Sequence, residues 1–140
     1  MGVRCPQPNS NPNPSPRLSR VRAPSVSSSD PQNLTLPLTS FVLQEKHELK
    51  LTVLVGHNTQ ITPEINQLSK QFQLLDVLGP ISNIAQTLWE HDVVICSGGV
   101  TLHEAISVGT PAFVINQVEH QQTKARFVEK SGAAINLGMG

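Results

Sequence analysis

The chain has 140 residues, enough for one domain. Ten basic and ten acidic residues give a formal net charge of zero, and aromatic residues make up only 4% of the chain, which argues against a nucleic-acid-binding surface. No stretch approaches the roughly 18 apolar residues of a membrane span. The two cysteines, Cys5 and Cys96, do not resemble a disulfide framework, so we expect a cytoplasmic protein in a reducing compartment.

The first 31 residues differ from the rest in composition. They hold seven of the eleven prolines, with many serines and asparagines. Such a segment has too little apolar surface to offset the entropy of ordering it. We therefore expect a disordered arm over residues 1–31 and one domain over residues 32–140. Four arginines precede the first acidic residue, Asp30, so an organelle-targeting peptide is an alternative interpretation of the arm.

Beyond the arm, apolar runs alternate with helical patterns. Strands are predicted at 51–56, 74–79, 92–96, 112–115 and 133–137, and helices at 33–50, 62–72, 81–91, 101–108 and 119–132. Buried strands separated by helices of about ten residues pair in parallel through right-handed crossovers. The pattern predicts a three-layer α/β/α Rossmann-like sandwich, with a parallel sheet of four or five strands.

Local signals mark several helix ends. Thr62 is predicted to cap the helix that begins at Pro63, and Gly109 is predicted to close the helix over 101–108. The first helix tolerates Pro37 only in its first turn. Its spacing predicts that one side faces the core, made of Leu34, Leu38, Phe41 and Val42.

Two glycines stand between a buried strand and a helix. In open α/β sheets ligands bind beyond the carboxyl ends of the strands, and strand 92–96 delivers Ser97, Gly98 and Gly99 to that edge. A glycine backbone can approach a ligand closely or adopt a positive φ, and the N–H groups at the start of the following helix suit a diphosphate. The alternative is a tight turn without a ligand. The dinucleotide fingerprint G-x-G-x-x-G is absent, so we expect no NAD or FAD cofactor.

Thr101 and Glu104 have two interpretations. Thr-x-x-Glu is the pattern of a capping box, worth about 1 kcal/mol, which needs no ligand. Alternatively, Glu104 lies about 4.5 Å along the helix axis from Thr101 and accepts hydrogen bonds from a ribose diol. Both interpretations stay open on the residues alone.

The loop after strand 112–115 reaches the same edge of the sheet. Its polar residues suit a sugar, and they are Asn116, Glu119, His120 and Gln121. Alternatively, Glu119 simply begins a helix, where the dipole favours an acid. We expect no metal site, because the pair His103-Glu104 lacks the second histidine of a zinc-protease helix.

These motifs together resemble a known family. The segment "DVVICSGGVTLHE" at 92–104, with Gly-Thr-Pro at 109–111 and Glu-His-Gln at 119–121, resembles the C-terminal, nucleotide-sugar-binding half of GT-B glycosyltransferases. The likeness is to the glycosyltransferase family 28 group, which includes the peptidoglycan N-acetylglucosaminyltransferase. The spacing is most similar to that of the UDP-sugar hydrolases of pseudaminic acid synthesis and of spore-coat polysaccharide proteins. "SDPQNLT", at 29–35, is similar to a stretch near the start of their C-terminal domain, so the resemblance spans about residues 29–138.

The resemblance implies roles for the candidate residues. It places the diphosphate at Gly98, Gly99 and Thr101, next to Ser97, and it assigns the ribose diol to Glu104. It further assigns uracil to the backbone near Pro80 and Ile81, and the sugar or phosphate to the later loop with Glu119, His120 and Gln121.

The chain departs from the family pattern in two ways. Ser27 and Ser28 stand where the relatives have Gly-Gly, and Pro24 interrupts the strand expected before them, so that strand is expected to be lost or displaced. The second departure is that the N-terminal, acceptor-binding half of the family is missing.

Three functions follow from the resemblance. The first is a UDP-sugar-binding module that transfers a hexosyl unit with a separate acceptor-binding half or other protein chain, as in the split N-acetylglucosaminyltransferase of dolichol-linked oligosaccharide synthesis. The second is a UDP-sugar hydrolase fragment, and the third is a non-catalytic nucleotide-binding remnant. The catalytic residues are not identified, because no nucleophile–base pair is evident, and we expect the isolated chain to be inactive.

Overall fold

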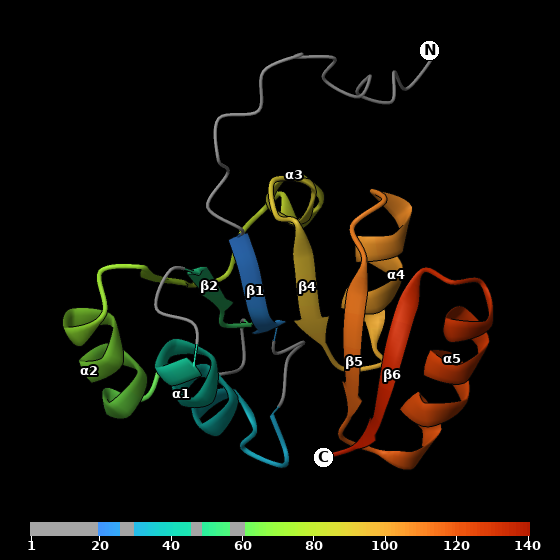
Figure 1. Ribbon diagram of the computed structural model, residues 1–140, viewed down its shortest axis with the longest axis horizontal. Helices are drawn as coiled ribbons and strands as arrows, with labels where there is room; N and C mark the ends of the chain where they lie inside the picture. The colour runs from blue at the N-terminus through green and yellow to red at the C-terminus, as the bar shows by residue number, and fades with distance from the viewer. Residues whose placement is uncertain (1–19, 26–29, 46–48, 57–60) are drawn as a thin grey trace.

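The computed structural model describes residues 20–25, 30–45, 49–56 and 61–140 (Figure 1). They form one six-stranded parallel sheet in the order β3-β2-β1-β4-β5-β6. Its strands are β1 (Arg20–Ser25), β2 (Lys50–Leu54), β3 (Leu75–Leu78), β4 (Val93–Cys96), β5 (Ala112–Asn116) and β6 (Ala134–Met139). The helices are α1 (Thr35–Glu45), α2 (Pro63–Gln71), α3 (Ile84–Trp89), α4 (Val100–Ser107) and α5 (Glu119–Lys130). The predicted Rossmann-like class is confirmed.

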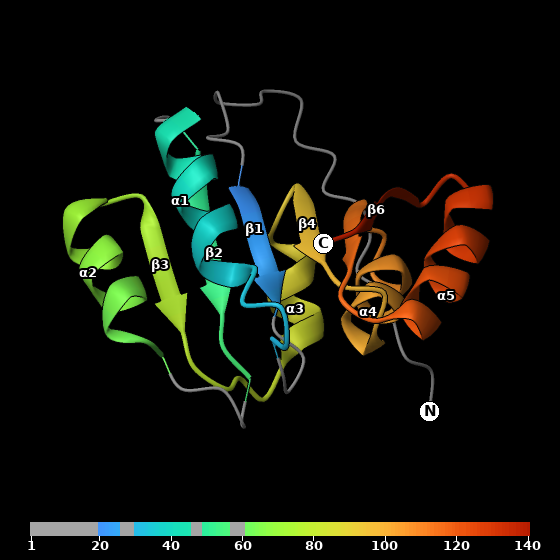
Figure 2. The ribbon, with the colours of Figure 1, turned by 90° about the horizontal axis from the view of Figure 1, so that it is seen from below.

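Helices cover both faces of the sheet (Figures 1 and 2). Leu51 and Val53 of β2 pack with Leu43 of α1 on one face. On the other face Val94 and Val114, from β4 and β5, lie in a second cluster whose helical members are Leu88, Leu102, Ala105, Ala125 and Val128. Helices α1 and α2 therefore cover one face, and α3, α4 and α5 cover the other. Among the helices of the described ranges, none combines the length and apolar character that a membrane crossing requires.

Strand β1 lies in the middle of the sheet, although its residues belong to the segment predicted to be an arm. It pairs in parallel with β2 and β4, and the three steps from Arg22 to Ser25 match two steps along β4, from Val94 to Cys96. Pro24 falls in this irregularity, a position where the sheet tolerates the missing N–H. The predicted sheet of four or five strands is thus corrected to six, because this segment has no apolar run that marks a strand.

The remainder of the predicted arm, residues 1–19 and 26–29, lies outside the described residues. The family departure at Ser27 and Ser28 and the thiol of Cys5 lie there too. The strand expected to be lost or displaced at Pro24 is present, and its irregular register is the local consequence of the proline.

Two of the predicted helix ends, at Thr62 and at Gly109, agree with the structure. The hydroxyl of Thr62 accepts a hydrogen bond from the N–H of Ile65 at 3.3 Å, and Pro63 is the first residue of α2. Gly109 follows α4 with a φ of 81°, the left-handed conformation that glycine adopts at helix ends.

The buried side of α1 differs from the prediction. Its buried residues are Thr35, Thr39 and Leu43, whereas Phe41 is 61% exposed. The hydroxyl of Thr39 donates to the carbonyl of Thr35 at 2.6 Å. A threonine whose hydroxyl is satisfied within its own helix can face the core, and apolar spacing does not detect it.

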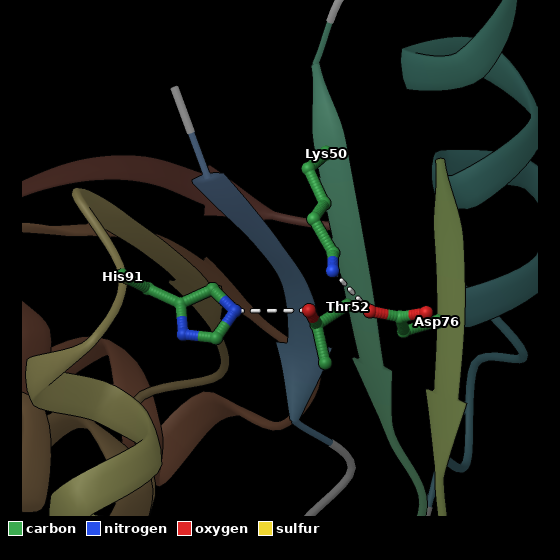
Figure 3. A network of polar contacts seen from close by, with 4 residues as sticks. All are labelled: Lys50, Thr52, Asp76 and His91. Atoms are coloured by element: carbon green, nitrogen blue, oxygen red, sulfur yellow. Dashed lines mark hydrogen bonds and ion pairs between the residues drawn. The ribbon is translucent and has the colours of Figure 1, made fainter. Parts of the chain in front are cut away.

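One side-chain hydrogen bond crosses β1 (Figure 3). His91 Nδ1 lies 2.6 Å from the carbonyl of Thr87, and a carbonyl only accepts, so Nδ1 donates. In the neutral ring Nε2 then accepts from the hydroxyl of Thr52 at 2.9 Å. Because Thr52 is in β2 and His91 precedes β4, this bond links the two halves of the sheet. Beside it, Lys50 and Asp76 form a partly exposed ion pair of 2.9 Å between β2 and β3.

We expect Leu102→Ala to lower the free energy of unfolding by about 2–5 kcal/mol, because the side chain is fully buried and its loss leaves a cavity. Urea unfolding measures the change. The control is Phe127→Ala on α5, where the side chain is 78% exposed and the expected change is within about 0.5 kcal/mol. Equal losses in the two variants would contradict the assignment of the core.

Candidate functional site

The order of the strands creates a switch point between β1 and β4. From these two central strands the chain proceeds outward in opposite directions, to β3 and to β6. In such sheets the connections leave on opposite faces, and a crevice opens at the carboxyl edge, where ligands bind. The loop 97–99 directly follows β4 and leads into α4. The predicted diphosphate loop therefore lies at the switch point.

Three of the helices begin with a side-chain cap. The carboxylate of Asp30 accepts from the N–H groups of Leu34 at 3.0 Å and Thr35 at 2.9 Å, at the start of α1. Thr62 caps α2, and Asn83 caps α3 by accepting from the N–H of Gln86. An acid already occupies the tip of α1, so that tip does not offer a free site for a ligand anion.

The other two helices begin without such a cap. Gly99 and Val118, the N-cap residues of α4 and α5, make no side-chain cap hydrogen bond. These helices follow β4 and β5, the strands that precede the predicted site. The N–H groups of a helix's first turn and the positive end of the helix dipole attract an anion. Of the two tips, that of α5 carries Glu119 in its first turn, so the tip of α4 is the better place for a diphosphate.

The capping-box interpretation of Thr101 and Glu104 is not realised. The N-cap of α4 is Gly99, with φ −96° and ψ −153°, and Thr101 is the second residue of the helix. Thr101 is 4% exposed. Glu104 is half-buried, and its carboxylate makes no hydrogen bond or ion pair within the part of the chain that the structure describes. This carboxylate is therefore available to a ligand.

The structure requires glycine at position 98 for a reason that the sequence did not reveal. Its φ is not in the left-handed region. A Cβ at this position would lie 2.6 Å from Asn116 Oδ1 and 2.7 Å from the carbonyl oxygen of Gln121. The missing side chain therefore admits protein atoms of the β5–α5 junction, instead of serving a positive φ or a ligand's close approach.

Two of the predicted sugar-loop residues bond to the protein. Asn116 is fully buried, and its Nδ2 donates to Asn136 Oδ1 at 2.9 Å and to the carbonyl of Gly138 at 3.0 Å. Gln121 Oε1 accepts from the N–H of Gln117 at 3.0 Å. These hydrogen bonds stabilise the conformation of the loop between β5 and α5.

The remaining predicted residues are accessible, with the exception of Ser97, which is buried. Glu119 and His120 are exposed in the first turn of α5. Pro80 is exposed and Ile81 is half-buried, in the connection from β3 to α3. Ser97 is 7% exposed at the end of β4. In residues 30–45, 49–56 and 61–140, no group of three or more His, Cys, Asp or Glu side chains could hold a metal ion.

Gln32 and Gln117 form a contact that the sequence analysis did not anticipate. The N–H of Gln32 donates to Gln117 Oε1 at 3.5 Å, and Gln32 Nε2 donates to the carbonyl of Gln117 at 3.4 Å. These bonds join the loop after β1 to the loop after β5. The partners are 85 positions apart, and no spacing rule links residues at that separation.

Comparison with known proteins identifies the family of the chain. The family model "Glycosyltransferase family 28 C-terminal domain" matches residues 29–138. The spore coat polysaccharide biosynthesis protein SpsG of Bacillus subtilis is 41% identical over 59 residues, which cover 42% of this chain and 17% of that protein. A UDP-N-acetylglucosamine–N-acetylmuramyl-(pentapeptide) pyrophosphoryl-undecaprenol N-acetylglucosamine transferase of Alkaliphilus metalliredigens is 31% identical over 105 residues, covering 68% of this chain and 29% of that protein.

Solved structures show the same fold. The glycotransferase of kitacinnamycin matches 99% of this chain and 34% of its own, with a TM-score of 0.70 and 19% identity. MnaA of S. aureus, solved with UDP, matches 86% of this chain and 32% of its own, with a TM-score of 0.60 and 12% identity. The chain thus spans about a third or less of the length of these relatives.

We expect Gly98→Ala to destabilise the protein by about 1–3 kcal/mol, because the new methyl group would overlap Asn116 and a backbone oxygen. The matched control is Gly79→Ala, where an added Cβ meets nothing within 4 Å and the expected change is within about 0.5 kcal/mol. Urea unfolding of both variants is the measurement. Unchanged stability in Gly98→Ala would show that this contact does not constrain the loop.

Proposed function

The chain belongs to the glycosyltransferase family 28 C-terminal domain family, and from this membership we propose that it binds a UDP-sugar. In this proposal it is the donor-binding half of a GT-B glycosyltransferase, and it transfers a hexosyl unit only with a separate acceptor-binding half or other protein chain. The main support is the start of α4 at the switch point, which has no side-chain cap, with the carboxylate of Glu104 in the same helix, which has no hydrogen bond or ion pair to the residues that the structure describes. The proposal includes a cytoplasmic location, which rests on the low cysteine content.

The diphosphate in this proposal is held by the backbone. The backbone N–H groups of Gly99 and Val100, at the start of α4, bind the diphosphate, while the side chain of Thr101 stays buried. Negative charge grows on the diphosphate as the bond to the sugar breaks, and a preorganised helix end stabilises that charge. Ser97 and Gly98 form the part of the loop that precedes this end of the helix.

In this proposal the nucleoside and the sugar contact residues next to the diphosphate loop. Glu104 accepts hydrogen bonds from the ribose diol, and the backbone near Pro80 and Ile81 receives the base. The exposed side chains of Glu119 and His120 meet the sugar. Support for a uridine nucleotide comes from relatives, since the transferase of Alkaliphilus metalliredigens is named for UDP-N-acetylglucosamine and S. aureus MnaA was solved with UDP.

We expect Glu104→Gln to weaken UDP binding about 10- to 100-fold, because hydrogen bonds to a charged group contribute about 1.5–3 kcal/mol. Isothermal titration calorimetry with UDP measures the affinity. Glu64→Gln is the control, since Glu64 is an exposed acid in the first turn of α2, and its affinity should equal that of the wild type. Unaltered affinity in Glu104→Gln would remove the ribose assignment, and a wild type that does not bind UDP would leave the remnant interpretation.

We expect the isolated 140-residue chain to release no UDP from UDP-N-acetylglucosamine, because it covers only about a third of the length of the structural relatives and, in this proposal, the acceptor-binding half lies outside these residues. A coupled assay for UDP, run without any acceptor, is the measurement. Catalytic release under these conditions would instead support the hydrolase alternative, which the motif spacing favours. Transfer that begins only when an acceptor-binding half is added would support the first proposal.

A further inference from the structure

Strand β6 gains one residue relative to β5 near the candidate site. Val114 is in register with Asn136 and Asn116 is in register with Met139, so three steps along β6 match two along β5. Gly138 lies within this bulge, with a φ of 96°, a conformation that favours glycine. Bulges of this kind redirect backbone groups next to functional sites.

The bulge fixes the side-chain amide of Asn116. Its two N–H donors are both used, one by Asn136 Oδ1 at 2.9 Å and the other by the carbonyl of Gly138 at 3.0 Å. Asn136 Oδ1 is itself held by the N–H of Gly138 at 3.1 Å. Because both donors point to β6, the amide oxygen must point away from it.

That oxygen faces the diphosphate loop. Among the residues that the structure describes, buried Asn116 Oδ1 has no hydrogen-bond partner, and it lies 2.6 Å from the position that a Cβ of Gly98 would occupy. A buried acceptor that stays unpaired is costly, so its position calls for a reason beyond stability. The carbonyl of Gln121 approaches the same point at 2.7 Å, and together the two oxygens define how closely Gly98 can lie to β5.

We infer that Asn116 is a positioning residue, which sets the place of the loop Ser97–Gly99 through Gly98 and does not touch the ligand. The inference rests on the proposed function, and it replaces the predicted sugar contact of Asn116 with an indirect role, since the side chain is fully buried. The bulge at Gly138 orients the amide of Asn116. The amide oxygen limits how closely the loop Ser97–Gly99 approaches β5, and the loop in turn sets the position of the start of α4, where the diphosphate binds.

The test compares UDP with uridine, which lacks the diphosphate. In Asn116→Ala we expect UDP affinity to fall about tenfold, since a small displacement of a binding group has large effects, while uridine affinity stays within about twofold. NMR titration measures both. The matched control is Val114→Ala, which removes another fully buried side chain of the same strand and keeps the Asn116 amide, and it should leave both affinities within about twofold of the wild type. Equal losses for UDP and uridine, or no loss in a folded Asn116→Ala, would overturn the inference.

A second measurement needs no ligand. We expect the amides of residues 98–100 to exchange hydrogen at least about threefold faster in Asn116→Ala than in Val114→Ala, because only the first variant frees the loop. Equal exchange would overturn the positioning role. A wild type that fails to bind UDP would refute the proposed function, and hydrogen exchange would still decide the role of Asn116. Should Asn116→Ala not fold, Asn136→Ala removes one partner of the amide and is expected to speed exchange at the same residues.

Discussion

The close approach of β4 to the β5–α5 junction is the constraint on which the candidate site depends. At Gly98 a single methyl group would already overlap the amide oxygen of Asn116 and a backbone carbonyl. The loop after β4 therefore packs tightly against β5, and α4 begins directly after this loop. Because the loop is short and held, the free N–H groups of α4 occupy one position at the carboxyl edge. The loop is thus already ordered in the folded chain, so that binding of a ligand there carries little further cost in conformational entropy.

The helices of the sheet differ in whether a side chain caps their first turn. Side chains satisfy the first turns of α1, α2 and α3, whereas α4 and α5 begin at residues whose side chains provide no cap. Asp30 places a negative charge at the tip of α1, and the contact between Gln32 and Gln117 holds that loop against the loop after β5. The start of α1 is therefore capped by the protein's own acid, whereas the start of α4 has no side-chain cap.

Much of the fold could be predicted because local chemistry decides it. Thr62 with Pro63 marks the start of α2, and Gly109 with Pro111 separates α4 from β5, as the structure confirms. The placement of the candidate residues along one edge of the sheet could also be inferred, because parallel strands bring their carboxyl ends to one edge, while their role in binding stays a prediction. The roles of Gly98 and Asn116 could not, because their partners come together only when β5 and β6 pair. Strand β1 escaped prediction for a related reason: its sequence "RVRAPS" has no apolar run, and its place is decided by the strands on either side.

The central position of β1 has a practical meaning for work on this family. The family match begins at residue 29, four residues after the strand that separates β2 from β4. A recombinant fragment trimmed to that boundary would keep both apolar clusters and lose the backbone ladder between them. Only contacts such as that of His91 with Thr52 would then span the gap. Where a domain appears to start in an alignment and where its sheet becomes continuous are, for this chain, two different places.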